Sequence, residues 1–193
     1  MASLFNYENL RKNTFLTESY DYIAKYESKS ANTIYVSSYD RFDIFLSHSY
    51  KDKDIIPALK KELESMGYTV YVDWITDKLL SREEVTKETA KVLQKRMQQS
   101  ECLFFATSEN SPNSKWMPWE LGYFDGIKNK RVAILPISKN NNNFSEYFQG
   151  QEYLGLYCWI VKDKKDYARD DLFIRCETYG SKTYIKEWLR STN

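Results

Sequence analysis

FDIFLSHSYKDKDIIPALKKELESMG, residues 42–67, combines one short apolar strand with one amphipathic helix, and this unit predicts the fold class. Its first six residues form an apolar run of the length of a buried strand. The helix that follows carries its apolar residues at helical spacing on one face: Ile56, Leu59, Leu63 and Met66. Gly67 is then the residue type that most often ends a helix. A buried strand followed by an amphipathic helix is the repeating unit of parallel α/β sheets.

The same alternation continues toward the C-terminus. Further apolar strands are expected at residues 68–74, 101–108, 131–137 and 153–161. Helices are expected at residues 81–100, 116–128, 143–150 and 179–190. Strict alternation of buried strands and helices indicates a parallel sheet covered on both faces, because right-handed crossovers leave few other arrangements. We therefore predict a flavodoxin-like, doubly wound α/β domain of three layers with a five-stranded parallel sheet.

Residues 1–40 differ from the rest of the chain because they are polar, rich in tyrosine and without a strong strand signal. Apolar residues nevertheless recur there at helical spacing: Leu4, Tyr7 and Leu10, and then Tyr20, Ile23 and Tyr26. Serine, asparagine and threonine cluster in residues 29–33 without apolar partners, as in a linker. We therefore divide the chain into an N-terminal helical extension, residues 1–40, and an α/β domain, residues 41–193.

The charge of the chain gives no support to binding of nucleic acid or membrane. The 193 residues include 28 Lys and Arg against 27 Asp and Glu, so a net charge of +1 leaves no electrostatic footprint for either partner. The first residues lack the apolar core of a signal peptide, and nowhere do about 18 apolar residues run together. We expect a soluble, cytoplasmic protein without nucleic-acid or membrane partners.

The cysteines and the single histidine, His48, do not have the pattern of a metal site. Cys102, Cys158 and Cys176 are odd in number, widely spaced and without a C-x-x-C pair. Cys102 and Cys158 lie in apolar runs, where a free thiol behaves as a small hydrophobic residue. We expect a reducing, cytosolic setting, no metal and no bound cofactor.

The predicted topology identifies which residues can line a binding site. In a doubly wound sheet, ligands bind in the crevice beyond the carboxyl ends of the strands. The residues that follow the first three strands, and therefore reach this crevice, are Ser47, His48, Ser49, Asp73, Trp74, residues 107–119 and Glu120.

Each residue after the first strand has two candidate roles. Ser49 and Asp52 have the spacing of a capping box, but a helix start with free hydroxyl groups also suits a phosphate. No Gly-rich nucleotide loop occurs elsewhere in the chain. His48, the only histidine, is a candidate acid or base. The chain has no nucleophile motif for this imidazole to activate, so we favour substrate contact or hydrogen bonding for His48.

The connection after the second strand, DWITDKLLSREEVTKE, exceeds the roughly two to six residues usual for such loops. Long loops at this edge often form lids or binding loops. Ser81 and Glu84 again have the spacing of a capping box, so the acidic pair of Glu83 and Glu84 is typical of a helix start. Arg82 has no such local explanation and is a candidate contact for a substrate phosphate.

The segment SKWMPWELGYFDG, residues 114–126, places one carboxylate among large apolar side chains. On a helix Trp116 and Glu120 are four residues apart and share a face, with Tyr123 near the same side. Such a pair can bind a nucleoside, because the ring stacks on the base while the carboxylate accepts hydrogen bonds from ribose hydroxyls. The alternative is a helix whose tryptophans pack on the sheet and whose Glu120 faces water.

Three segments, in this order and spacing, resemble the bacterial branch of the TIR (Toll/interleukin-1 receptor) domains: FDIFLSHSYKD, YTVYVDW with its long loop, and SPNSKWMPWELGYFDG. The resemblance covers about residues 41–190, and its most specific part is the W-x-x-x-E element from Trp116 to Glu120. It implies the flavodoxin-like sheet, Glu120 as the catalytic residue and residues 74–81 as the so-called BB loop. The N-terminal extension lies outside it.

For bacterial TIR proteins the resemblance implies that NAD+ is a substrate. The nicotinamide–ribose bond breaks, and nicotinamide leaves with ADP-ribose or a cyclic ADP-ribose isomer as the other product. Stand-alone members are similar to the signal-producing component of anti-phage systems such as Thoeris, whose nucleotide product activates a downstream effector. TIR sites are commonly completed by a neighbouring subunit, which implies self-association through TIR surfaces.

Two other functions stay open from the sequence. A non-catalytic TIR module would act through homotypic association, and its function would not depend on the Glu120 carboxylate. A nucleoside deoxyribosyltransferase-like enzyme can share this sheet and a glutamate, and it would act on free nucleosides and ignore NAD+.

Overall fold

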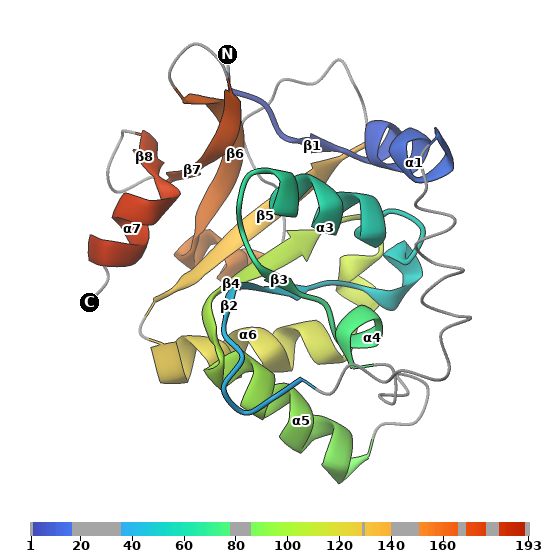
Figure 1. The fold of residues 1–193 in the computed structure, drawn as a ribbon, viewed down its shortest axis with the longest axis vertical. Helices are drawn as coiled ribbons and strands as arrows, with labels where there is room; N and C mark the ends of the chain where they lie inside the picture. The colour runs from blue at the N-terminus through green and yellow to red at the C-terminus, as the bar shows by residue number, and fades with distance from the viewer. Residues whose placement is uncertain are drawn as a thin grey trace.

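The computed structural model describes residues 2–16, 36–77, 86–128, 130–139, 151–165, 169–176 and 182–191, which form one sheet with helices on both faces (Figure 1). The parallel part of the sheet comprises β2 (Phe42–Ser47), β3 (Val70–Tyr71), β4 (Ser100–Thr107), β5 (Val132–Ser138) and β6 (Cys158–Lys165). Their order is β3-β2-β4-β5-β6, so the chain leaves β2 toward one edge and then returns toward the other. The predicted doubly wound, five-stranded parallel sheet is confirmed.

Three further strands extend this sheet beyond the prediction. β7 (Arg169–Arg175) pairs antiparallel with β6, and β8 (Lys182–Tyr184) pairs antiparallel with β7. β1 (Phe5–Asn6) pairs in parallel with β5. β7 is largely charged and half-exposed, and β8 and β1 are very short, so none of them has the apolar run by which buried strands are recognised.

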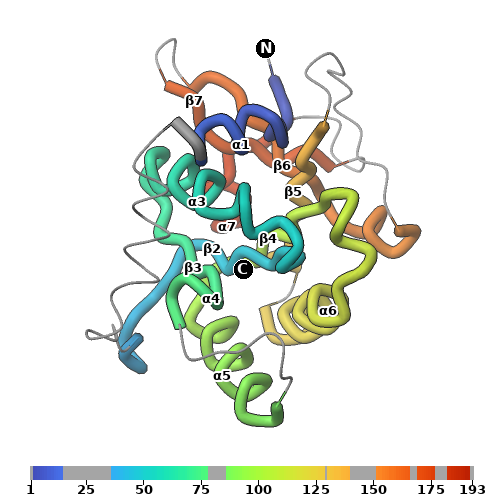
Figure 2. The backbone as a smooth tube through the Cα atoms, turned by 90° about the vertical axis from the view of Figure 1, so that its right-hand side faces the viewer, coloured from blue at the N-terminus to red at the C-terminus, as the bar shows by residue number. Residues whose placement is uncertain are grey.

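Helices cover the two faces of the sheet in separate groups. The buried residues of α1 (Tyr7–Leu16), α3 (Ile56–Ser65) and α7 (Ile185–Ser191) pack on one face. Those of α5 (Lys87–Gln98) and α6 (Trp116–Lys128) pack on the other. Figure 1 shows α3 and α6 on opposite sides of the strands, and the turned view of Figure 2 shows the same separation. The predicted three layers are therefore present.

Short helices occupy several connections between these elements. They are α4 (Asp73–Thr76) and three 3₁₀-helices, η1 (Tyr50–Asp52), η2 (Ser111–Asn113) and η3 (Glu152–Leu156). η1 follows β2, α4 follows β3 and η2 follows β4, so these three turns lie at the carboxyl edge of the sheet, where the site was predicted.

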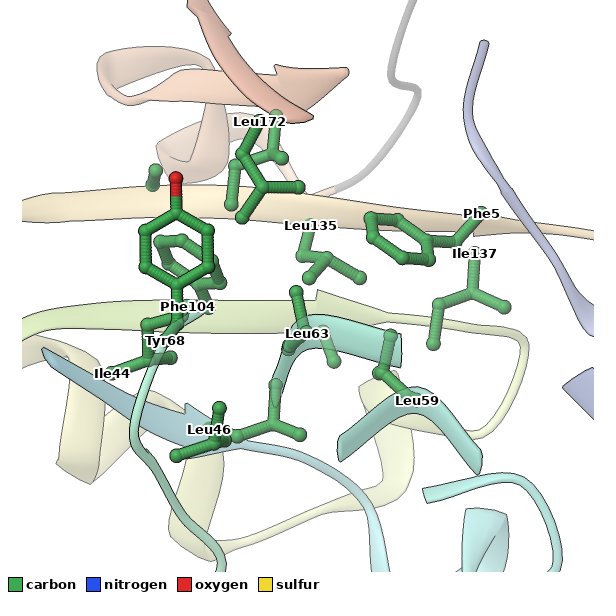
Figure 3. Close-up of a cluster of buried hydrophobic side chains, with 14 of the residues drawn as sticks. Phe5, Ile44, Leu46, Leu59, Leu63, Tyr68, Phe104, Leu135, Ile137 and Leu172 are labelled. Atoms are coloured by element: carbon green, nitrogen blue, oxygen red, sulfur yellow. The ribbon is translucent and has the colours of Figure 1, made fainter. Parts of the chain in front are cut away.

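Side chains along the strands alternate between the two helical layers. In β4, Phe104 packs in the layer of α3 whereas Leu103 and Phe105 pack in the layer of α6. Figure 3 shows the first of these layers, in which Leu59 and Leu63 of α3 lie against residues of the sheet. Burial of each such side chain contributes about 1.5 to 3 kcal/mol. The sheet therefore has a core on both faces, as the apolar strand runs predict.

Several predicted boundaries differ from the structure. β3 ends at Tyr71, because the chain turns into α4 at Asp73 rather than remaining extended to residue 74. The first part of the predicted strand 153–161 is η3, and the strand begins at Cys158. The predicted last helix, residues 179–190, is preceded by β8, so α7 begins only at Ile185. In each case a short turn or strand pairing overrides the local apolar pattern.

Other predictions lie outside the described residues. These are the helix at residues 143–150, the pattern of Tyr20, Ile23 and Tyr26, the linker at 29–33 and the helix start at 81–85. The described part of α5 begins at Lys87, after Thr86, whose Oγ1 accepts a hydrogen bond from the Thr89 N–H at 3.1 Å. Thr86 is thus the N-cap of this helix.

The described part of the N-terminal extension belongs to the core rather than standing apart from it. Phe5 and Leu10 are buried in the layer of α3, and β1 pairs with the last two residues of β5, Ile137 and Ser138. Ser3 exchanges two backbone hydrogen bonds with Lys162 of β6, both at 2.8 Å. The helical character predicted for Tyr7 and Leu10 is confirmed by α1, whereas a domain boundary at residue 40 stays a prediction.

The cysteines differ from the expectation of free thiols. Cys158 and Cys176 form a disulfide that joins β6 to the end of β7, where the antiparallel pairing brings their Cα atoms to 4.4 Å. This pairing could not be predicted from the spacing of the cysteines, because only the antiparallel pairing of β6 with β7 makes the two residues neighbours. Cys102 is free and fully buried in β4, and burial raises the pKa of its thiol.

A buried ion pair fixes the end of α4 to α5. Arg96 donates from Nε to Asp77 Oδ2 at 2.7 Å and from Nη2 to Oδ1 at 3.0 Å. The Tyr71 hydroxyl also donates to Asp77 Oδ2, at 2.9 Å. A third guanidinium nitrogen of Arg96 donates to Gln99 at 2.8 Å. This network links both described flanks of the connection between β3 and α5.

We expect Arg96→Met to lower the free energy of unfolding by about 2 to 4 kcal/mol, because Asp77 loses two charge-assisted hydrogen bonds in a poorly solvated position. Urea denaturation monitored by circular dichroism measures the change. The control is Glu101→Gln, which breaks an exposed ion pair with Arg131 and should cost less than about 1 kcal/mol. Equal losses in the two variants would contradict the role assigned to Arg96.

Candidate active site

A buried carboxylate lies where α6 crosses the carboxyl end of β2. The Ser47 hydroxyl, at the last position of β2, donates to Glu120 Oε2 at 2.6 Å, and neither residue has any exposed surface. Glu120 lies on the face of α6 that also carries Met117, Leu121 and Phe124, all packed against the sheet. The helix therefore directs this carboxylate inward, and the alternative of a Glu120 facing water is wrong.

Such a position is unfavourable for a carboxylate unless its oxygens are hydrogen-bonded. The apolar side chains around α6 provide no solvation, so the short bond from Ser47 supports the negative charge directly. A buried, hydrogen-bonded carboxylate at the carboxyl edge of a doubly wound sheet is a candidate for chemistry, because such groups are rarely retained for stability alone.

Aromatic side chains form a continuous row along the outer side of α6. The rings of Trp116 and Trp119 meet edge to face with centroids 5.3 Å apart, and Trp119 stacks on Tyr123 at 5.8 Å. The Tyr123 hydroxyl accepts a hydrogen bond from Gln98 of α5 at 2.9 Å. Trp116 is one turn before Glu120 and only half-buried, so part of its ring is open to a ligand. Trp119 was not singled out from the sequence, although positions 116, 119 and 123 have helical spacing.

His48 links the connections after β2 and β3. Its Nδ1 lies 2.9 Å from the Leu46 carbonyl oxygen, and its Nε2 lies 2.9 Å from the indole nitrogen of Trp74. Because indole can only donate, Nε2 is the acceptor and Nδ1–H the donor, which assigns the neutral tautomer. Asp73 Oδ1 is 3.9 Å from Nε2, too far for a direct hydrogen bond. An acid–base role for His48 would therefore break a bond that positions Trp74.

The predicted capping box at Ser49 and Asp52 is only half present. Ser49 caps η1 by accepting a long hydrogen bond, 3.4 Å, from the Lys51 N–H. The Asp52 carboxylate instead accepts from Ser108 Oγ at 2.5 Å and from Asn110 Nδ2 at 2.6 Å. Its role is thus to join the connections after β2 and β4. Burial raises the pKa of Asp52, and its two hydrogen bonds partly offset this rise.

A cavity of about 410 Å³ lies on the other side of this edge, between α1, the connection after β4 and the end of β5. Its lining includes Tyr7, Arg11, Asn110, Ile137 and Lys139. Ile137 packs in the layer of α1 and α3, so the cavity is on the opposite face of the sheet from Glu120. The sequence did not predict it, because it depends on how α1 packs.

The structure therefore brings Ser47 and Glu120 into contact and places His48, Trp74 and Asp73 together at the same edge. Tyr123 lies toward α5, and Ser49 caps η1. Arg82 and the rest of residues 78–85 lie outside the described residues, so the predicted phosphate contact has no structural counterpart to report. Among the described residues, no group of three or more His, Cys, Asp or Glu side chains could hold a metal ion.

Comparison with known proteins agrees with this geometry. A TIR domain family model matches residues 44–173, which include most of β2, Glu120 and most of the sheet. The chain belongs to the TIR domain family. The match begins after the N-terminal extension and ends within β7.

Two relatives of this TIR protein are informative. It is 48% identical over 165 residues to "Probable 3' cyclic ADP-D-ribose synthase ThsB'" of Bacillus cereus (strain MSX-D12), covering 83% of this chain and 84% of that protein. It is 35% identical over 132 residues to "Putative cyclic ADP-D-ribose synthase TIR2" of Cytobacillus dafuensis. That second match covers 61% of this chain but only 34% of the relative. In the described part of the TIR protein, no helix is both long and apolar enough to cross a membrane.

The raised pKa of Asp52 predicts a definite pH dependence. The folded state binds a proton at Asp52 more tightly than the unfolded chain does, so this residue's contribution to stability is present below the unfolded pKa of about 3.9 and is lost as pH rises through the folded pKa. Asp52→Asn removes the titration. We expect the free energy of unfolding of the variant, relative to wild type, to increase as pH rises from about 4 toward neutrality. Urea denaturation across that range measures it, and a difference that falls with pH would contradict the assignment.

Proposed function

We propose that this TIR protein cleaves NAD+ at the nicotinamide–ribose bond, releasing nicotinamide and a cyclic ADP-ribose-type product or linear ADP-ribose. The observation that carries the proposal is the buried Glu120 carboxylate, held by Ser47 at the carboxyl edge of the sheet. The names of both relatives refer to synthesis of cyclic ADP-D-ribose, which supports the same substrate class for this chain.

The chemistry requires little beyond one well-placed carboxylate. Nicotinamide in NAD+ carries a positive charge and leaves as a neutral molecule, so no acid is needed to protonate it. Positive charge then develops at the ribose carbon in an oxocarbenium-like transition state, as in glycoside hydrolysis. Glu120 would offset that charge and accept hydrogen bonds from ribose hydroxyls. Ser47 would keep the carboxylate in one orientation, because its hydroxyl donates a hydrogen bond to one of the two carboxylate oxygens, Oε2.

Neighbouring groups would supply binding rather than bond cleavage. Trp116 presents part of its ring one turn before Glu120 and would stack on the nicotinamide or on the base. The His48–Trp74 hydrogen bond would fix the opposite wall of the crevice. Attack by water on the ribose carbon gives ADP-ribose, and attack by a group of the same molecule gives a cyclic product. The relative at 48% identity favours the cyclic outcome.

Substrate access requires a change from the structure described here. Glu120 is fully covered, so the side chains over it must move before a ribose can reach its oxygens. Contacts between TIR domains could stabilise a conformation in which Glu120 is accessible. We therefore propose that the active form is an assembly of several copies of this chain. The product would then act as a signal for a downstream effector, as in Thoeris-type anti-phage defence.

A second candidate is a non-catalytic TIR module. The complete burial of Glu120 is the observation that favours it, because a buried carboxylate bonded to Ser47 can also serve to position α6. In that case replacement of Glu120 would change stability without removing any activity on NAD+.

We expect Glu120→Gln to reduce nicotinamide release by at least about 100-fold, because a neutral amide cannot offset the developing charge. Glutamine still accepts the hydrogen bond from Ser47, so the fold should be retained. The concentrated, purified protein is incubated with NAD+ or with free nucleosides, and released nicotinamide or base is measured by chromatography.

The matched control is Glu101→Gln, which should keep wild-type activity, because Glu101 lies at the amino end of β4 whereas Ser47 ends the neighbouring strand β2. Equal nicotinamide release by wild type and Glu120→Gln would refute the catalytic role. Base release from nucleosides without reaction of NAD+ would instead indicate a deoxyribosyltransferase-like enzyme.

We expect the rate of nicotinamide release per molecule to rise with protein concentration, because an assembled form is more populated at higher concentration. A wide dilution series at fixed NAD+ concentration measures this, with molar mass followed in parallel by light scattering. A rate strictly proportional to enzyme concentration over the whole series would show that the monomer is fully active.

A further inference from the structure

Thr107 carries a buried hydroxyl that has no hydrogen-bond partner in the part of the chain that the structure describes. It is the last residue of β4 and only 7% exposed. Within the described residues, its Oγ1 has no hydrogen-bond partner. By contrast Ser100, at the first position of the same strand, donates from its hydroxyl to the Arg96 carbonyl oxygen at 2.8 Å. Of the two hydroxyl side chains at the ends of β4, Ser100 has a hydrogen-bond partner among the described residues and Thr107 has none.

The hydroxyl lies on the face of the sheet that carries Glu120. Leu103 and Phe105 of β4 pack in the layer of α6, and side chains alternate along a strand. Thr107, two residues beyond Phe105, therefore continues on that same face. Phe45 of β2 also belongs to this layer, which places Ser47 on it by the same alternation.

The strand register places Thr107 beside the Ser47–Glu120 bond. Ser47 of β2 is paired with Phe105 of β4, so Thr107 is one same-face position further toward the carboxyl edge on the neighbouring strand. With strands about 4.8 Å apart and a rise of about 3.3 Å per residue, the Cα atoms of Ser47 and Thr107 are roughly 8 Å apart. A ligand group that contacts Glu120 from the edge would pass over this hydroxyl.

An unpartnered buried hydroxyl lowers stability, because it loses its hydrogen bonds to water without replacement. Valine has nearly the same shape and would avoid this loss. Native buried polar groups are nearly always satisfied by protein, water or ligand. The hydroxyl of Thr107 is therefore explained if a bound ligand supplies its partner.

We infer that Thr107 Oγ1 forms a hydrogen bond with a ribose hydroxyl of bound NAD+, next to the ribose held by Glu120. This inference rests on the proposed function. An uncharged hydroxyl that both donates and accepts matches another hydroxyl. The carboxylates of Asp73 and Glu120 reach the same edge, so an anionic phosphate is disfavoured there. Thr107 thus determines affinity for the sugar, whereas Glu120 acts on the bond that breaks.

The test compares Thr107→Val and Thr107→Ser with wild type in steady-state nicotinamide release. We expect Thr107→Val to raise KM for NAD+ by about 3- to 10-fold with kcat within about 2-fold, the size of one uncharged hydrogen bond made equally in ground and transition states. Its Tm should equal or exceed that of wild type. Thr107→Ser retains the hydroxyl and should keep KM within about 2-fold.

Ser100→Ala is the matched control on the same strand, and it should lower Tm while leaving KM unchanged. A wild-type KM in Thr107→Val would overturn the inference. So would a lower Tm in Thr107→Val combined with changes in KM and kcat that Thr107→Ser shows as well. If wild type and Thr107→Val are equal while Glu120→Gln is inactive, only this inference fails. If wild type releases no nicotinamide, the proposed function fails and the inference fails with it.

Discussion

The hydrogen bond from Ser47 to Glu120 is the constraint on which the arrangement of the site depends. It joins the end of β2 to α6 and buries a carboxylate among apolar side chains. Such a group is tolerated only with hydrogen-bond support, so β2, α6 and the residues between them must be held in register. The two-sided core provides that register, since β2 and β4 are central strands covered by helices on both faces.

Polar contacts then hold the connections at the carboxyl edge against one another. Asp52 joins the turn after β2 to the turn after β4, and His48 joins it to Trp74 after β3. Arg96 and Asp77 fix the next segment to α5. Each contact links residues far apart in sequence, so several independent hydrogen bonds and ion pairs position these connections. Glu120 is fully buried at this same edge of the sheet, where Ser47 ends β2.

The elements with strong local signals were predicted well. β2 and α6 have the predicted bounds because β2 is a short, largely apolar strand segment and α6 has apolar residues at helical spacing. Gly67 has a φ of +89° just after α3, as its role at the helix end requires. β7 and β8 were missed because their residues are charged or half-exposed. The Cys158–Cys176 bond was missed for a related reason, since only that hairpin brings the two thiols together.

By itself the sequence determined the doubly wound order of strands and helices, the TIR family and the spacing of Trp116 and Glu120 on one helix. These depend on periodicity and on short motifs, which are local properties of the chain. Tertiary structure alone decided that Glu120 points inward to Ser47, 73 residues away, and that Asp52 binds Ser108 rather than its own helix start. It also decided that Thr107 Oγ1 has no hydrogen-bond partner among the described residues. Burial and hydrogen bonding of a side chain are set by the segments that pack over it, and no spacing within its own segment specifies them.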